Sequence, residues 1–261
     1  MQRRTFIQSH LPQFLILGIA VVLPLKAWAA DVAESHPLHP LLLHAYEAKK
    51  AMNRINDYEA MFTKREMVNG KMLTTQMQLK LRERPFSVYT RFVNPHAGRE
   101  IIFVEGRNNN LMRAHEGSGL ASLVGTISLP IDGPDARKEN RYPINMVGMT
   151  NLIDKIVEQW EYEGQFGEIE VKQYPQAKLG NLNCIALESS HPQPRKQFRY
   201  QMTRLYIDKD SKLPVRVEQY EFPAQPGTAP VLVEEYTYTN IRVNLQFSDA
   251  DFDENNPNYK F

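Results

Sequence analysis

The chain has 261 residues, of which 31 are Lys or Arg, 30 are Asp or Glu and 42% are hydrophobic. This composition is typical of a globular protein and excludes an intrinsically disordered or fibrous chain. The first thirty residues contain three basic residues and no acidic one, so the rest carries 28 basic and 30 acidic residues, a balance that disfavours a nucleic-acid partner because phosphate binding requires clustered Lys and Arg.

The first 29 residues have the pattern of an export signal peptide. An arginine pair at 3–4 precedes an apolar run at 14–25, and small residues at 27–29 predict cleavage near Ala29. The run would span roughly 18 Å as a helix, short of the ~30 Å hydrocarbon core, which disfavours a membrane anchor. The arginine pair, with the aromatic and aliphatic residues that follow it, also resembles a twin-arginine signal. We therefore expect a periplasmic protein.

Residues 30–40 are predicted to form a linker and residues 41–261 a single domain. The first predicted element of the domain is an amphipathic helix. Its apolar residues recur at steps of three and four: Leu41, Leu42, Ala45, Ala48, Met52 and Ile55.

Alternation with a period of two begins near residue 58 and predicts strands. The first two, at 58–67 and 72–84, are predicted to form a hairpin because Asn69-Gly70 favours a type I′ turn. Turn residues separate the further predicted strands, at 86–93, 99–104, 111–115, 168–174, 183–189, 197–208, 214–222 and 231–238.

Two segments interrupt this series of strands. Residues 116–145 are rich in Gly and Pro and have little periodicity, so they are predicted to form a long connection that could act as a lid. Residues 150–162 have one apolar face and predict a second helix, with Thr150 as its N-cap.

About ten strands and two helices in a non-alternating order predict an α+β domain with an antiparallel sheet. Strands with one apolar face can form a curved sheet, which the two helices either fill or only plug. A plugged sheet would keep a cavity for an apolar ligand. Periodicity does not separate these two forms.

No catalytic, cofactor or metal site is predicted from motifs. His36 and His39 fall in the linker with two prolines, which disfavours a zinc site with His44. Cys184 lies in an apolar strand and is interpreted as a buried hydrophobic residue rather than a nucleophile. The acidic tail from Asp249 lacks the glycine at the sixth position that an EF-hand requires, since that position is Glu254. Paired carboxylates for glycoside chemistry stay open, because they would meet only in the fold.

Several short motifs together resemble a known family. They are Arg84-Pro85-Phe86-Ser87-Val88-Tyr89, Glu100 to Gly106, Arg141-Tyr142-Pro143-Ile144, Ile207-Asp208 with Leu213-Pro214-Val215-Arg216, Glu235 to Tyr238, and Asp251 to Phe261. The chain resembles, over about residues 55–261, an exported bacterial domain-of-unknown-function family (number 1571). That family is in turn similar to the LolA/LolB lipoprotein carriers. The resemblance implies an incomplete, strongly curved β-barrel of about ten to eleven antiparallel strands, closed by two helices around a hydrophobic cavity.

We therefore expect a periplasmic carrier or sensor that holds acyl chains. Its ligand would be a lipid or an acylated protein, and an inner- or outer-membrane protein is a candidate partner. The candidate cavity residues are Met77, Leu79, Leu81, Val88, Ile102 and Val104 on strands, with Leu152, Ile156 and Trp160 on the second helix.

Two alternatives from other classes remain: an envelope hydrolase or glycan-modifying enzyme, and a non-catalytic protein-docking module. An apolar cavity would favour the carrier, whereas converging carboxylates with a histidine would favour the enzyme. A filled sheet with an exposed apolar patch would favour the docking module.

Overall fold

A computed structural model describes residues 32–225 and 227–261 of the chain. The predicted signal peptide, residues 1–29, lies outside them. The described residues form eleven strands: β1 (Asp57–Val68), β2 (Lys71–Arg82), β3 (Ser87–Asn94), β4 (Glu100–Val104), β5 (Leu111–His115), β6 (Ile127–Pro130), β7 (Glu170–Leu179), β8 (Leu182–Ser190), β9 (Met202–Asp208), β10 (Pro214–Glu221) and β11 (Val231–Val243).

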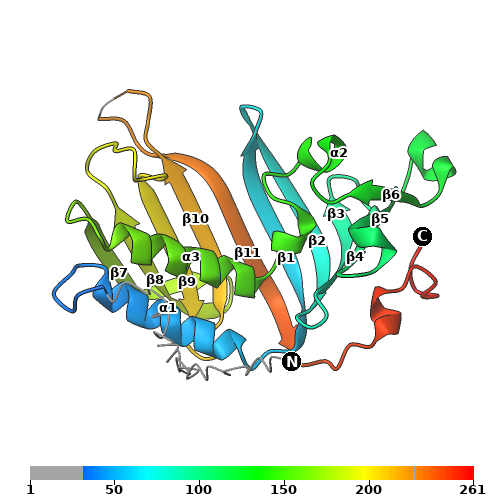
Figure 1. The fold of residues 1–261 in the computed structure, drawn as a ribbon, viewed down its shortest axis with the longest axis horizontal. Helices are drawn as coiled ribbons and strands as arrows, with labels where there is room; N and C mark the ends of the chain where they lie inside the picture. Colours follow the sequence, from blue (N-terminus) through cyan, green and yellow to red (C-terminus); the bar gives the residue numbers. More distant parts are fainter. Residues whose placement is uncertain (1–31, 226) are drawn as a thin grey trace, which may run out of the picture.

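All eleven strands belong to one antiparallel sheet, as the sequence predicted. Their order is β6-β5-β4-β3-β2-β1-β11-β10-β9-β8-β7. The first and last strands of the domain, β1 and β11, therefore pair at its centre. Strands β6 and β7 form the two edges and are not paired with each other within the described residues, so the sheet is open (Figure 1). Strand β6 was not predicted, because it is short and lies within the Gly- and Pro-rich connection.

The predicted hairpin of β1 and β2 is confirmed. Its turn consists of Asn69 and Gly70, which both have positive φ angles, of 50° and 76°. A type I′ turn requires this conformation at both central positions, and its twist matches that of the two strands. The turn thereby sets the register in which Phe62 lies opposite Met77 and Lys64 lies opposite Thr75.

Both predicted helices are present and lie side by side on one face of the sheet, called the inner face here (Figure 1). The α-helices are α1 (His39–Met52), α2 (Pro134–Arg137) and α3 (Met149–Glu163), and short 3₁₀ turns occur at Asn108–Asn110, Leu120–Val124, Ile144–Met146 and Asp249–Phe252. Helix α3 packs on β10, and α1 packs on α3. We expected the two helices to close the sheet, but they do not close it alone. The chain between β6 and α3 covers the inner face beside them (Figure 1). None of the described helices is long and apolar enough to cross a membrane.

The N-terminus of α3 is held by two tyrosines of the sheet. The hydroxyl of Tyr58 accepts a hydrogen bond from the backbone N–H of Met149 at 2.9 Å, and that of Tyr238 accepts one from Gly148 at 3.1 Å. These bonds satisfy backbone donors that a helix leaves unpaired in its first turn. Thr150 was predicted as the N-cap but lies inside the first turn, after Gly148, whose φ of 122° is rarely adopted by residues with side chains.

The C-terminal segment covers the outer face of β3 and β4. Phe252 packs against Ile102 and Val104, and the ring of Tyr259 stacks on Tyr89 with 4.0 Å between centroids. The acidic residues of this segment pair with strand residues and cap the turn at 249–252. The outer face of these two strands is therefore buried as well as the inner one.

Residues 32–38, which the sequence assigned to the linker, form turns that pack on the domain. The side chain of Leu38 is fully buried in the main core, and Val32 packs against the same core. The imidazole Nε2 of His36 lies 2.9 Å from the backbone oxygen of Phe166. This segment is therefore continuous with the domain.

Candidate functional site

A cavity of about 870 Å³ lies between the inner face of the sheet and its cover. We call residues 131–148 the covering segment; together with α3 it forms the side of the cavity opposite the strands. The strands contribute mainly apolar side chains, among them Phe62, Met77, Phe92, Ile101, Met112 and Leu129. The covering segment and α3 add Ile144, Met146, Val147, Leu152 and Ile156. The volume falls within the ~300–1,000 Å³ that is usual for small-molecule sites.

The strand register explains why these apolar residues meet. Met77 lies opposite Phe62 on one side and Phe92 on the other. Ile101 lies opposite Ala114 of β5, which lies opposite Ile127 of β6. Because opposite residues of an antiparallel pair point to the same face, each row continues across the sheet.

The cavity has a polar end, where the inward side chains of the central strands change from apolar to charged or polar. Along β1 the inward residues run from Phe62 to Lys64 and Glu66. In β11, Tyr236 lies opposite Lys64 and Glu234 lies opposite Glu66. Two acids, a lysine and a tyrosine are thereby brought together on an otherwise apolar face, and all but the half-buried Tyr236 are fully buried.

Glu66 and Glu234 are joined by one tyrosine. The hydroxyl of Tyr236 lies 2.6 Å from Glu66 Oε1 and 3.2 Å from Glu234 Oε2. Glu234 Oε1 also accepts hydrogen bonds from the hydroxyls of Tyr142, at 3.2 Å, and Tyr200. Burial raises the pKa of Tyr236, as do the charges of the two carboxylates, so its hydroxyl stays protonated and remains a donor.

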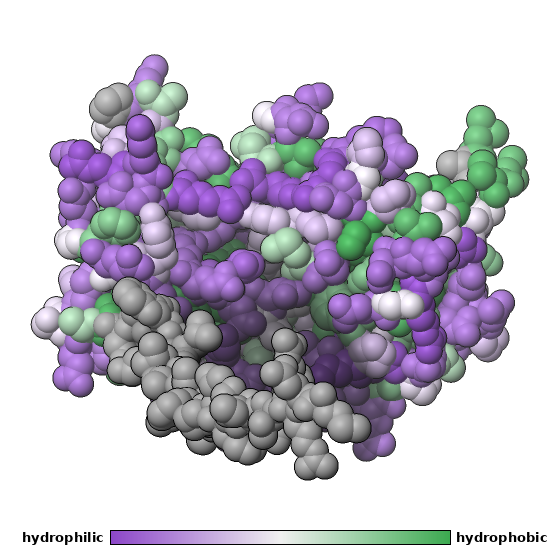
Figure 2. Space-filling view, viewed as in Figure 1, coloured by the Kyte–Doolittle hydropathy of each residue, from purple (hydrophilic) through white to green (hydrophobic). Residues whose placement is uncertain are grey.

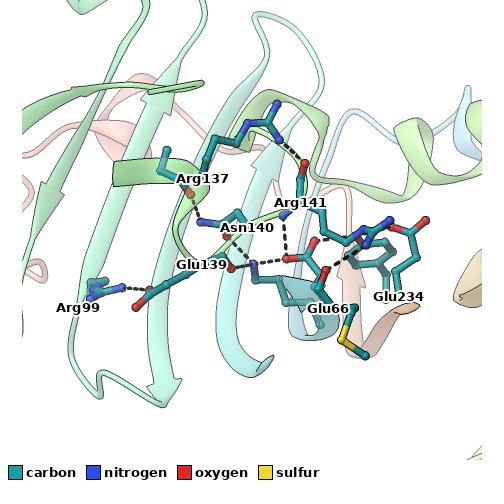
Figure 3. A network of polar contacts seen from close by, with 11 residues as sticks. Glu66, Arg99, Arg137, Glu139, Asn140, Arg141 and Glu234 are labelled. Atoms are coloured by element: carbon teal, nitrogen blue, oxygen red, sulfur yellow. Dashed lines mark hydrogen bonds and ion pairs between the residues drawn. The ribbon is translucent and has the colours of Figure 1, made fainter. Parts of the chain in front are cut away.

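The same carboxylates hold the covering segment on the sheet (Figure 3). Lys64 Nζ lies 2.8 Å from Glu66 Oε2 and donates to the backbone oxygen of Glu139 at 3.1 Å and to the side chain of Asn140. The backbone N–H of Arg141 donates to Glu66 at 3.2 Å, and its guanidinium lies 3.3 Å from Glu234 Oε2. Every carboxylate oxygen of this pair therefore has a partner, and the cluster fastens residues 139–141 over the cavity.

A second set of ion pairs holds the covering segment from the turn between β3 and β4. Arg99 lies 2.9 Å from Glu139 and 2.7 Å from Glu116, and His96 lies 3.2 Å from Glu139. Burial opposes ionisation of Glu139, but Arg99 and His96 outweigh it, and the pKa of this carboxyl is lowered. The segment is thus held at residue 139 by charge rather than by apolar packing.

The nine predicted cavity residues fall into three places. Met77, Leu152 and Ile156 line the cavity. Leu79, Leu81, Val88 and Trp160 lie in the main core, where Trp160 also donates a hydrogen bond to Ser189 at 2.9 Å. Ile102 and Val104 lie on the outer face, under the C-terminal segment.

The different positions of these residues follow from strand parity and coverage. Val88 lies opposite Phe103, so Ile102 and Val104 must point to the other face of the sheet. Strand β4 is apolar at nearly every position because both of its faces are covered, and alternation then gives no sign of which face is inward.

Sequence reasoning missed the polar cluster. The sign was present in β1, where Phe62, Lys64 and Glu66 share one face and the apolar alternation ends. A matching sign was Glu234 on the strand that carries the Glu-Tyr-Thr-Tyr motif. Only the pairing of β1 with β11 brings the two together, and that pairing joins residues about 170 positions apart.

Two further features considered in the sequence are the cysteine and the candidate metal ligands. Cys184 is fully buried, as predicted, and burial raises the pKa of its thiol to about 11. Among the described residues, no group of three or more His, Cys, Asp or Glu side chains gathers as a metal site would require.

Comparison with known proteins gives a family and distant structural similarities. Residues 55–261 match the family model described as "Protein of unknown function (DUF1571)", which confirms the resemblance inferred from the motifs. No curated protein matches the chain.

Three solved structures are similar to this chain at low sequence identity. LprF from Mycobacterium bovis is 9% identical, with 82% of this chain and 97% of that chain covered and a TM-score of 0.46. The lipoprotein LppX from Mycobacterium tuberculosis is 12% identical, with 80% and 97% covered and a TM-score of 0.45. A putative outer membrane lipoprotein-sorting protein domain from Vibrio parahaemolyticus is 14% identical, with 82% and 96% covered and a TM-score of 0.38.

Proposed function

The chain belongs to the DUF1571 family, and we propose that it is a periplasmic lipid-binding protein, a carrier or sensor that holds acyl chains in the cavity under the covering segment. The observation that carries this proposal is the cavity itself. Its strand side is mostly apolar, and its volume of about 870 Å³ is that of a ligand site rather than of a packing defect. The ligand would be a lipid or the acyl chain of a lipoprotein.

The way the cavity is covered supports entry of a ligand. The covering segment is fastened at residues 139–141 by ion pairs and hydrogen bonds. Hydrogen bonds and ion pairs can be exchanged for bonds to entering water, whereas separating packed apolar surfaces is opposed by the hydrophobic effect. Lifting residues 139–141 would therefore open the cavity while Ile144 and Val147 stay packed on the main core.

The proposed location follows from residues 1–29, whose pattern is that of a cleaved export signal. Fractionation of cells that express the full chain should place the mature protein in the periplasm, with Edman sequencing starting near residue 30. A chain that keeps its N-terminus and sediments with membranes would contradict this part of the proposal.

The test of the function is native mass spectrometry of the mature protein purified from the periplasm without detergent, followed by solvent extraction. We expect a stoichiometric adduct that is recovered as a lipid. An apo mass together with no uptake of added phospholipid or acyl peptide would contradict the proposal.

A substitution in the cavity makes this test specific. Ala114 lines the cavity and lies opposite Ile101, so Ala114→Trp would place a large ring in the space proposed for the acyl chain. We expect at least a tenfold loss of lipid uptake, by steric exclusion, with the unfolding midpoint nearly unchanged. The control is Ala224→Trp, which adds the same ring at an exposed position outside the cavity. Equal uptake by the two variants would place the lipid elsewhere.

One observation favours a second role, docking on a membrane through apolar side chains that insert between the lipids. No charged residue occurs between 117 and 131, and the β5–β6 connection in this stretch exposes Leu120 by 86%, Leu123 by 81% and Val124 by 72%. These side chains form part of the apolar projection at the upper right of Figure 2. The connection leads into β6, which lines the cavity, so docking there would bring the cavity close to the lipid.

Vesicle sedimentation tests the docking role. Replacing both Leu120 and Leu123 by Ser should weaken binding to phosphatidylethanolamine–phosphatidylglycerol vesicles by about tenfold or more, because two large apolar side chains can no longer be buried. Leu43→Ser, at an exposed position of α1, is the control and should bind as the wild type does. Unchanged sedimentation of the double variant would contradict docking through this connection.

A further inference from the structure

Five basic side chains line the cavity, and one of them differs from the others in its partners. Four form ion pairs with carboxylates: Lys64 with Glu66, Arg99 with Glu116 and Glu139, Lys138 with Asp135, and Lys155 with Glu158. Arg199 forms no such pair with any carboxylate in residues 32–225 and 227–261. Its charge is therefore available to a ligand.

Two tyrosines fix the position of this guanidinium. Arg199 Nη2 donates to the hydroxyl of Tyr142 at 3.1 Å, and the guanidinium carbon lies 5.1 Å from the centre of the Tyr200 ring. Both tyrosines in turn donate to Glu234. The side chain is thus oriented by the buried polar cluster although it is itself exposed at the cavity mouth.

Glu234 is the carboxylate whose charge acts on Arg199 and could compete with a ligand for it. Both of its oxygens already have other partners. Oε1 accepts from Tyr142 and Tyr200, and Oε2 has Tyr236 and Arg141 as partners. An arginine carries five N–H donors, and among the described residues Arg199 uses one of them, on Tyr142. The remaining donors form the fork that binds a carboxylate or phosphate through two parallel hydrogen bonds.

We infer that the cavity takes an amphiphile with an anionic headgroup, whose carboxylate or phosphate is bound by Arg199 while its acyl chain lies against the apolar strands. This inference rests on the proposed function and names its class of ligand. Arg199, Tyr142 and Tyr200 line the same cavity as Met77 and Ile101, so one molecule can contact both ends. Arg199 then acts as the specificity-determining residue for the headgroup.

Equilibrium dialysis of the mature protein with three probes tests the inference: dodecanoate, dodecyl phosphate and the uncharged methyl dodecanoate. For Arg199→Gln we expect about a tenfold loss of affinity for the two anionic probes, since a hydrogen bond to a charged group is lost. Affinity for the methyl ester should stay within about twofold, because its contacts are apolar. The ratio between dodecanoate and dodecyl phosphate tells which anion the wild type prefers.

Two further variants separate a headgroup role from a general effect. Arg195→Gln removes an exposed arginine that is paired with Glu168 and does not line the cavity, and should leave all three affinities unchanged. Arg199→Lys should restore part of the affinity for the anions, because it keeps the charge but not the fork. Circular dichroism and the urea midpoint check that each variant is folded.

The outcomes are distinguishable. If Arg199→Gln weakens all three probes equally, or none of them, the headgroup inference is wrong while lipid binding stands. If the wild type binds no probe, both the inference and the proposed function are overturned.

Discussion

The inner face of the sheet is covered by helices over β8–β10 and by irregular chain over β2–β6, and different forces hold the two covers. On the helical side, Trp160 and Ile153 of α3 lie in one apolar core with Leu205 and Val217 of the strands. On the other side, residues 139–141 are fastened by Lys64 and its neighbours, and a cavity remains beneath.

The difference follows from backbone hydrogen bonding. A helix satisfies its own backbone groups and can present a continuous apolar face to the sheet, as the periodic residues of α3 do. An irregular segment must find partners for its N–H and C=O groups elsewhere. The covering segment finds two of them in Lys64 and Glu66 of β1, and contacts of this kind do not fill the space below as apolar side chains would.

The largest expected effect compares one large residue from each side. Trp160 is fully buried, so Trp160→Ala should lower the free energy of unfolding by about 3–5 kcal/mol, through lost burial and a cavity. Leu129 is half-buried and already faces open space, so Leu129→Ala should cost about 1 kcal/mol. Urea denaturation measures both. Equal losses would mean that the β2–β6 side is packed as tightly as the helical side.

The helical side could be predicted from the sequence, because its information is local. The apolar residues at steps of three and four in 41–55 and 150–162 predicted two helices, which are α1 and α3 in the structure. Asn69-Gly70 predicted the first hairpin. Such patterns depend on neighbours within about one turn of helix or one strand pair. The prediction of Thr150 as the N-cap was wrong. The hydroxyls that accept from the first turn belong to Tyr58 and Tyr238, which come from distant strands.

The β2–β6 side, which holds the cavity, could be predicted only in part. Alternation found Met77, and the helical period found Leu152 and Ile156, all three of which line the cavity. It could not tell the inner from the outer face of β4, where Ile102 packs under the C-terminal segment. Nor could it bring Glu66 to Glu234, since that meeting depends on which strands pair at the centre of the sheet.

The smallest expected effect concerns the pH dependence of the two covers. Arg99 and His96 outweigh burial and lower the pKa of Glu139. A carboxyl whose pKa is lower in the folded state stabilises that state above its unfolded pKa, near 4.3, and this stability is lost as the pH falls through the folded value. Acid should therefore loosen the covering segment while α3, held by apolar packing, keeps its protection.

Hydrogen exchange, corrected for its intrinsic pH dependence, can measure this difference between about pH 6 and about pH 3.5. Because the side chain of Glu139 is 44% exposed, solvent screens its ion pairs, and the change in local stability at residues 137–142 should be below about 1 kcal/mol. Glu139→Gln cannot ionise there, so this variant should lose the part of the pH dependence that the ion pairs cause. If the protection of this variant falls on acidification as much as the wild type's does, the ion pairs of Glu139 do not cause the pH dependence of the covering segment.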